Sequence, residues 1–223
     1  MKKIIITSAL ISLAMISQAQ WFIGGSLEYN FTSKKPERGT SESYSKFSFA
    51  PTVGYQMYKF AFGTGFVFSA GTEIETRWVY SGWWGPFSYD VKIESTLWGI
   101  QPFVHYTFVE FGKFSIFANA GLHILGGNRK EFNPFNSSAV DLEFDITSFG
   151  INIVPVLSYN LSERISLEAA LNFMNFGWNR VYQEDKANKT NTGTVTNFGF
   201  GINTGNVANV SALSFGFIYK FKN

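Results

Sequence analysis

Large apolar side chains alternate with small or polar ones along much of the chain. At the C-terminal end, one set of alternate positions holds Leu213, Phe215, Phe217, Tyr219 and Phe221. The positions between them are mostly small or polar, and the same two-residue period recurs in 46–55, 60–69 and 165–173. A period of two residues predicts β-strands that have one apolar face and one small or polar face.

Extended through the chain, this pattern predicts eight strands. They lie at about 21–31, 46–56, 60–80, 89–109, 114–127, 146–159, 164–178 and 210–221. Short connections near 56–59, 110–113 and 160–163 alternate with longer polar stretches at 32–45, 81–88, 128–145 and 179–209. The sequence leaves open whether Phe198, Phe200 and Ile202 form the upper half of the last strand, fold into the interior of the domain or belong to a long loop.

The motif Pro-x-x-x-Tyr occurs three times, beginning at Pro51, Pro102 and Pro155, with intervals of 51 and 53 residues. Each copy ends just before a short connection. Proline cannot donate a ladder hydrogen bond and normally lies at edges or bulges. A bulge or a register change is therefore expected at each of these prolines.

The N-terminal segment has the pattern of a secretory signal peptide. Lys2 and Lys3 precede an apolar stretch from Ile4 to Ile16, and the small residues Ser17 and Ala19 come before a cleavage site after Ala19. The apolar stretch is too short for a transmembrane helix, which needs about 20 residues. The sequence therefore divides into a signal peptide, 1–19, and one mature domain, 20–223.

Export, an even number of antiparallel strands and alternating short and long connections together predict the fold class. It is all-β: an eight-stranded antiparallel up-and-down transmembrane β-barrel with short periplasmic turns and longer extracellular loops. A soluble barrel such as a lipocalin is the alternative, but it places large apolar residues inside and charges outside. In this chain the phenylalanine face opposes glycine, alanine and serine, which favours contact with lipid.

Composition narrows the function classes. The 223 residues include 25 phenylalanines and no cysteine, and only 15% are charged. The absence of cysteine excludes disulfides, cysteine zinc sites and a thiol nucleophile. Without residues 1–19 the chain has 16 basic and 16 acidic residues, so no nucleic-acid partner is expected.

The C-terminal alternation of Phe215, Phe217, Tyr219 and Phe221 resembles the assembly signal that the outer-membrane insertion machinery reads, although Lys222 and Asn223 follow it. The mature chain resembles the small outer-membrane β-barrels of Gram-negative bacteria, in the OmpA/OmpX-like and PorT-like group. The resemblance implies insertion from the periplasm with both termini on that side. It also implies contact with outer-membrane lipid, with lipopolysaccharide and, during assembly, with the insertion machinery.

Aromatic residues are expected at the membrane interfaces, where a ring is buried and a polar tip stays hydrated. The turn-side set is Tyr55, Tyr106, Tyr159, Tyr219 and Phe221, and the loop-side candidates are Trp78, Trp83, Trp84 and Trp178. For Trp83 and Trp84, packing within the loop is the alternative.

The small-residue faces also carry polar side chains that should point into the barrel. They are Glu28, Lys46, Gln101, His105, His123, Glu168 and Lys220, with Asn119 and Asn152 beside them. Glu168 and Lys220 lie near one end of neighbouring strands, where an ion pair is expected. An eight-stranded barrel is just wide enough for side chains to fill it, which argues against a general porin. The set is interpreted as a polar plug, with a narrow conduction path as the alternative.

No catalytic, cofactor or metal site is predicted. His105 and His123 are the only imidazole bases and should lie well apart, and Ser69 and Ser95 are nucleophile candidates by residue type alone. Asp141, Glu143 and Asp145 share one face, which indicates an acidic solvated rim rather than a calcium site. The chain is therefore not expected to be an enzyme.

The outer ends of the strands are the expected place of function. The segments 73–80 and 89–96 predict a hairpin above the bilayer that is either solvated or able to bind a protein by strand addition. Lys34, Lys35, Arg38, Arg129 and Lys130 are candidates for contact with lipopolysaccharide phosphates. The favoured function is a non-enzymatic outer-membrane protein with a structural or surface-interaction role. The alternatives are a narrow channel for small or hydrophobic molecules and, less favoured, a lipid-modifying enzyme.

Overall fold

The structure is a computed structural model that describes residues 20–34, 42–81, 85–133, 136–172, 174–187, 189, 191–202 and 213–221. The segment 1–19 predicted as a signal peptide lies outside the described residues, as do Lys35, Arg38, Trp83 and Trp84.

The described chain is almost entirely β-strand. The strands are β1 (Gln20–Lys34), β2 (Glu42–Met57), β3 (Phe60–Ser81), β4 (Gly85–Phe111), β5 (Phe114–Asn133), β6 (Asn136–Asn160), β7 (Ile165–Leu171), β8 (Met174–Asp185), β9 (Asn191–Ile202) and β10 (Leu213–Lys220). No helix among the described residues is long and apolar enough to cross a membrane.

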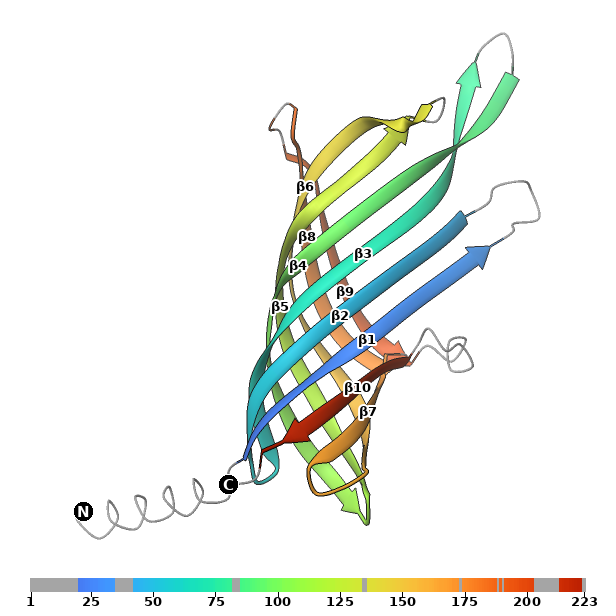
Figure 1. Cartoon of the computed structure of the whole chain (residues 1–223). Helices are drawn as coiled ribbons and strands as arrows, with labels where there is room; N and C mark the ends of the chain where they lie inside the picture. Colours follow the sequence, from blue (N-terminus) through green and yellow to red (C-terminus); the bar gives the residue numbers. More distant parts are fainter. Residues whose placement is uncertain are drawn as a thin grey trace.

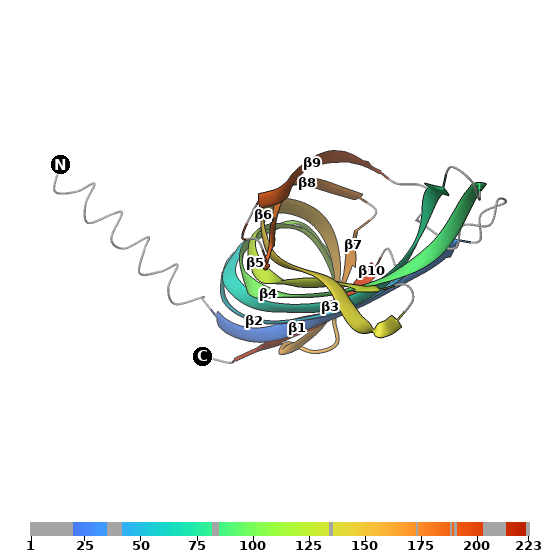
Figure 2. The ribbon, with the colours of Figure 1, turned by 90° about the horizontal axis from the view of Figure 1, so that it is seen from above.

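All strand pairings are antiparallel, and the paired strands follow one another around a closed ring (Figures 1 and 2). β7 and β8 both pair with β6 and share one position in the ring, while β9 pairs with β8 and β10 pairs with β7. The ring therefore has eight positions. It closes in its turn-side half, where residues 22–27 of β1 pair with β10 while β2 pairs on the other side, so the predicted eight-stranded up-and-down barrel is confirmed.

The prolines of the repeat do not all disturb the sheet. β2 keeps the same register with β3 on both sides of Pro51, and β4 keeps the same register with β5 on both sides of Pro102. The expected register change is therefore wrong at these two residues. There the ladder omits the proline and the residue before it and then resumes. The missing N–H of proline therefore interrupts the pairing for two residues without shifting the register.

Opposite Pro155 the neighbouring strand does break. Val156 pairs with Ala170 of β7, but Ile153 pairs with Phe176 of β8, so the partner strand advances six residues while β6 moves by three. The extra residues lie around Asn172, whose Nδ2 donates to Ser214 Oγ at 2.6 Å. The seventh position of the barrel is split at this point.

The outward positions form an apolar band. On β1 they hold Trp21, Ile23, Gly25, Leu27, Tyr29 and Phe31, and on β6 the run from Phe149 to Tyr159 is similar. Ile23, Leu27 and Ile153 are all exposed, whereas the inward side chains beside them are small, polar or buried. Each run covers about 11 residues, which is the length of a tilted transmembrane β-strand. On β6 the exposed polar residues Thr147 and Asp145 follow directly above the band.

The two ends of the barrel differ. At the turn end, Tyr58 and Gly112 adopt positive φ in the tight connections, and β1 begins and β10 ends there (Figure 1). At the other end the strands continue beyond the band, so much of the polar sequence expected in loops forms hairpins. β3 and β4 stay paired up to Ser81 and Gly85, which confirms the projecting hairpin. Residues 191–202, which the sequence left open, pair with β8 as the upper part of the eighth position.

The turn-end aromatics contact one another across strands. Trp21 meets Tyr55 edge to face at 5.3 Å, Phe60 lies 4.9 Å from Tyr106, and Phe114 lies 4.8 Å from Tyr159, measured between ring centroids. Tyr219 and Phe221 form a similar edge-to-face pair at 5.3 Å. The five predicted interface aromatics thus lie at the turn-side border of the apolar band, in the position that the sequence predicts for a girdle.

Candidate functional site

A hydrophobic plug lies inside the barrel lumen in its turn-side half. Phe22, Ala61, Phe103 and Ile218 form a cluster of buried side chains, contributed by β1, β3, β4 and β10. The two phenylalanine rings pack directly against glycines. A Cβ at Gly54 would meet the Phe22 ring, and a Cβ at Gly63 would meet the Phe103 ring. The sequence places glycines on the inner face where two phenylalanines must enter a narrow lumen.

His105 belongs to this plug rather than to a polar site. Its ring stacks between Phe103 and Phe117, with centroid separations of 4.5 and 4.6 Å. His123 lies on the next strand, four residues beyond the residue that pairs with His105, or about 13 Å further along the barrel. There its Nε2 lies 3.2 Å from Asn179 Oδ1, which also accepts a hydrogen bond from Ser148 Oγ at 3.0 Å.

The plug separates two chambers. The loop-side chamber has a volume of about 280 Å³ and the turn-side chamber about 250 Å³. Phe22, His105, Phe117, Glu168 and Ile218 line both, so they form the partition.

The loop-side chamber has mixed chemistry. Glu28, Lys46, Gln101, Asn119 and Asn152 line it together with aliphatic side chains. Gln101 Nε2 and Asn152 Oδ1 are 3.5 Å apart across Gly121, and Glu28 Oε1 accepts from Asn30 Nδ2 at 2.6 Å. Asn119 Oδ1 is buried without a hydrogen-bond partner.

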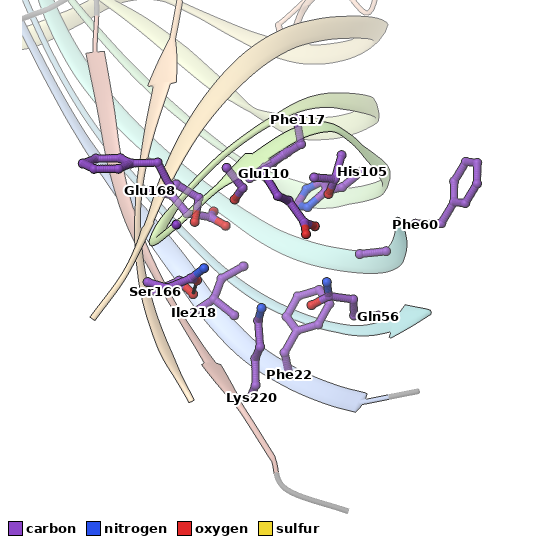
Figure 3. A pocket seen from close by; sticks show the side chains of 17 residues that line it. Phe22, Gln56, Phe60, His105, Glu110, Phe117, Ser166, Glu168, Ile218 and Lys220 are labelled. Carbon is purple, nitrogen blue, oxygen red and sulfur yellow. Dashed lines mark hydrogen bonds between the residues drawn. The ribbon is translucent and has the colours of Figure 1, made fainter. Parts of the chain in front are cut away.

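The turn-side chamber holds the remaining charges (Figure 3). Glu110, Glu168 and Lys220 line it, with hydroxyls of Ser158 and Ser166. The predicted Glu168–Lys220 ion pair does not form: no ion pair among the described residues involves either side chain, although they face the same chamber. The seven predicted interior polar residues all lie on inward faces, but they are divided between separate clusters.

The nucleophile candidates lie apart from the histidines. Ser69 Oγ accepts from Ser48 Oγ at 3.2 Å, and Ser95 lies on β4 opposite Gly71 and Arg129. Among the described residues, neither histidine has a hydrogen bond to a serine hydroxyl.

Sequence reasoning missed the plug, although a signal for it exists. Phe22 and Phe103 occupy positions on faces that otherwise hold Gly24, Ser26 and Gln101, so each is a large residue on a small or polar face. Such an exception to the alternation marks a side chain that fills the lumen rather than one that meets lipid.

Above the band, an arginine–glutamate cluster joins the β3–β4 hairpin to β5. Glu131 accepts from Arg77 at 2.9 Å and from Arg129 at 3.1 Å, and Arg77 also contacts Glu75 at 3.2 Å. Glu131 is 7% exposed, so this is a largely desolvated contact. Arg129 therefore points inward, and of the predicted phosphate-binding cations only Lys130 is seen on the outward face, 3.9 Å from Glu143.

The acidic face on β6 forms a rim with a lysine. Lys186 Nζ lies 2.8 Å from Glu143 Oε1 and 3.5 Å from Asp145 Oδ1, and its hydrogen bond holds the pKa of Glu143 below the usual range. The side chain of Asp141 lies outside the described residues, and no metal-binding group of acidic or histidine residues is found within them.

We expect Glu131→Gln to loosen the outer part of the β3–β4 hairpin while leaving the membrane-spanning barrel closed. Removing one partner of a fully buried ion pair costs about 3–5 kcal/mol, and the cost here is smaller because the side chains left behind, Arg77 and Arg129, are 37% and 24% exposed to solvent. Glu94→Gln is the matched control, since Glu94 is half exposed beside Lys92 and an exposed pair contributes about 0–1 kcal/mol. Hydrogen exchange should show lost protection in 75–92 for the first variant only; equal protection in the two variants would contradict the assignment.

Comparison with known proteins finds similar solved structures and no family. No protein-family model and no curated protein matches the chain. Neisserial surface protein A is 17% identical over 91% of this chain and 99% of that one, with a TM-score of 0.43. A major outer membrane protein of Thermus thermophilus is 9% identical over 92% and 100%, with a TM-score of 0.40. The outer membrane protease OmpT of Escherichia coli is 8% identical over 91% and 93%, with a TM-score of 0.35. Membership of the OmpA/OmpX-like or PorT-like group stays a prediction.

Proposed function

We propose that this chain is an integral outer-membrane β-barrel protein without enzymatic activity, exported through a cleaved signal peptide, that acts by binding another protein above the membrane. The observation that carries the proposal is the outer part of the β3–β4 hairpin, 75–81 and 85–92, here called the ribbon. β2 pairs with β3 only as far as Ile74, and β5 pairs with β4 only from Ile93. Beyond these points β3 and β4 pair with each other up to Ser81 and Gly85.

The ribbon is held rigidly at its base, which favours recognition over a merely solvated hairpin. Val91 and Ile93 are each 3% exposed, and Arg77 connects the ribbon to Glu131 of β5. Neither β2 nor β5 forms ladder pairs with the ribbon, so its edges are candidates for strand addition by an extended segment of a partner. Figure 1 shows the ribbon reaching beyond the neighbouring β1–β2 hairpin.

The other parts of the barrel have supporting roles in this proposal. The apolar band contacts lipid, the outer rim with Lys130 meets lipopolysaccharide, and the outward aromatic edge of β10 serves the insertion machinery during assembly. The plug opposes the alternative of a narrow channel, because a cluster of buried apolar side chains separates the two chambers.

Cysteine labelling tests the placement, because the chain has no cysteine of its own. Ser88→Cys, in the ribbon, should react with a membrane-impermeant maleimide in intact cells. Ser162→Cys, which is exposed at the turn end, should react only after the outer membrane is permeabilised. Labelling of both or of neither in intact cells would contradict the proposed orientation.

Photo-crosslinking tests the binding role. A photoreactive residue at Ser88 should give an adduct with one defined protein in intact cells. The control position is Lys186, which is exposed near the end of β8 on another hairpin. The same adducts at equal yield from both positions, or none from Ser88, would argue against a protein partner at the ribbon.

A further inference from the structure

The turn-side chamber contains opposite charges that face the same space without contacting each other. Glu168 extends from β7 and Lys220 from β10, two strands that are hydrogen-bonded neighbours. Glu110 enters from β4. Figure 3 shows the side chains of Glu168, Glu110 and Lys220 around the cavity, with no hydrogen bond drawn between them.

Lys220 attracts Glu168 and Glu110 across the chamber without a direct ion pair, which leaves room for a partner between the charges. A charge enclosed by a barrel costs several kcal/mol unless another group compensates it. Within the described residues, no side chain forms an ion pair with Glu168 or Lys220. The chamber volume of about 250 Å³ lies between them, so a small molecule fits where a direct ion pair is missing.

The charges define what such a molecule would be. A positive group would meet Glu168, with Glu110 as a second acceptor, while a negative group would meet Lys220. The Ser158 hydroxyl lies beside Glu168, since the two residues pair across β6 and β7, and offers a further hydrogen bond. Phe22, Phe117 and Ile218 form an apolar floor for the carbon skeleton.

We propose that the turn-side chamber binds a small zwitterion that carries one ammonium and one carboxylate, of the size of a free amino acid. The volume is below the roughly 300–1,000 Å³ of sites for drug-sized ligands, which favours a smaller guest. This site is independent of the ribbon and of its partner.

Binding is tested on the full mature chain refolded in detergent. The probes are glycine, β-alanine and 4-aminobutyrate, which differ in charge separation, with ethylamine and propionate carrying one charge each. Saturation-transfer NMR should show binding of at least one zwitterion at millimolar concentration, with both single-charge probes at least about tenfold weaker. Failure of all three zwitterions to bind, or equal binding of a single-charge probe, would overturn the proposal.

Variants locate the site. Glu168→Gln and Lys220→Met should each weaken binding of that zwitterion by about tenfold or more, because each removes one charged hydrogen bond. Lys113→Met is the matched control, since Lys113 is exposed in the β4–β5 turn and does not line the chamber. If one of the two chamber variants fails to refold, binding to the other variant tests whether the zwitterion occupies the chamber. Unchanged binding in a folded variant would place the zwitterion elsewhere and overturn the assignment.

Discussion

Replacing both Phe22 and Phe103 by alanine should produce discrete conductance steps in planar bilayers, whereas the wild-type barrel is expected to carry no ion current. The two ring centroids lie 6.3 Å apart; Phe22 lines both chambers, of about 280 and 250 Å³, and Phe103 lines the larger one beside it. Both chambers are lined by carboxylate, ammonium, amide and hydroxyl groups. Without the rings, water would join the chambers into a continuous path.

The double variant needs a folding check and a matched control. Loss of a buried phenylalanine typically costs about 3–5 kcal/mol, so the refolded variant must first show the heat-dependent electrophoretic shift of a closed barrel. Phe66→Ala removes a phenylalanine ring from the outward face, where Phe66 is 48% exposed, and should give no conductance steps. A folded double variant that stays silent would mean that other side chains close the lumen. Wild-type protein with the same steps would instead favour the channel alternative.

The barrel can be predicted well from the sequence because one face of each strand contacts lipid and the other lines the lumen. Large apolar side chains are favourable where β1 and β6 contact lipid, whereas only small side chains such as glycine, alanine and serine fit on the side that faces the narrow lumen. The same rule sets strand number and closure, which depend only on counting alternating runs. Strand ends are harder to predict, because above the apolar band both faces meet water and the alternation loses its meaning. This is why 128–145 reads as a loop although most of it forms paired strand.

The candidate sites are less predictable because they depend on register. Alternation places Glu168 and Lys220 on inward faces but does not show that they stop short of an ion pair. It also does not show that Glu131 on β5 forms an ion pair with Arg77 on β3, because β4 lies between these two strands. The stacking of His105 between two phenylalanines requires the pairing of β4 with β5. Only the departures from alternation at Phe22 and Phe103 could have been read from the sequence.

Ile153→Arg should destabilise the refolded barrel by about 2–4 kcal/mol, measured by urea unfolding in lipid vesicles. Ile153 points outward near the middle of the apolar run of β6 and is 38% exposed. A guanidinium at this depth loses its hydration without gaining a partner. Thr147→Arg is the control on the same strand and face, but it lies just above the band, where the cost falls to about 0–1 kcal/mol.

The contrast between these two variants distinguishes the membrane barrel from the soluble alternative. If the outward face met water, as in a lipocalin, arginine at Ile153 would be solvated and the two substitutions would have similar small effects. A difference that depends on depth arises only when a hydrocarbon layer surrounds the barrel. Equal stability of the two variants would therefore reject the membrane assignment, even if the strand topology remained correct.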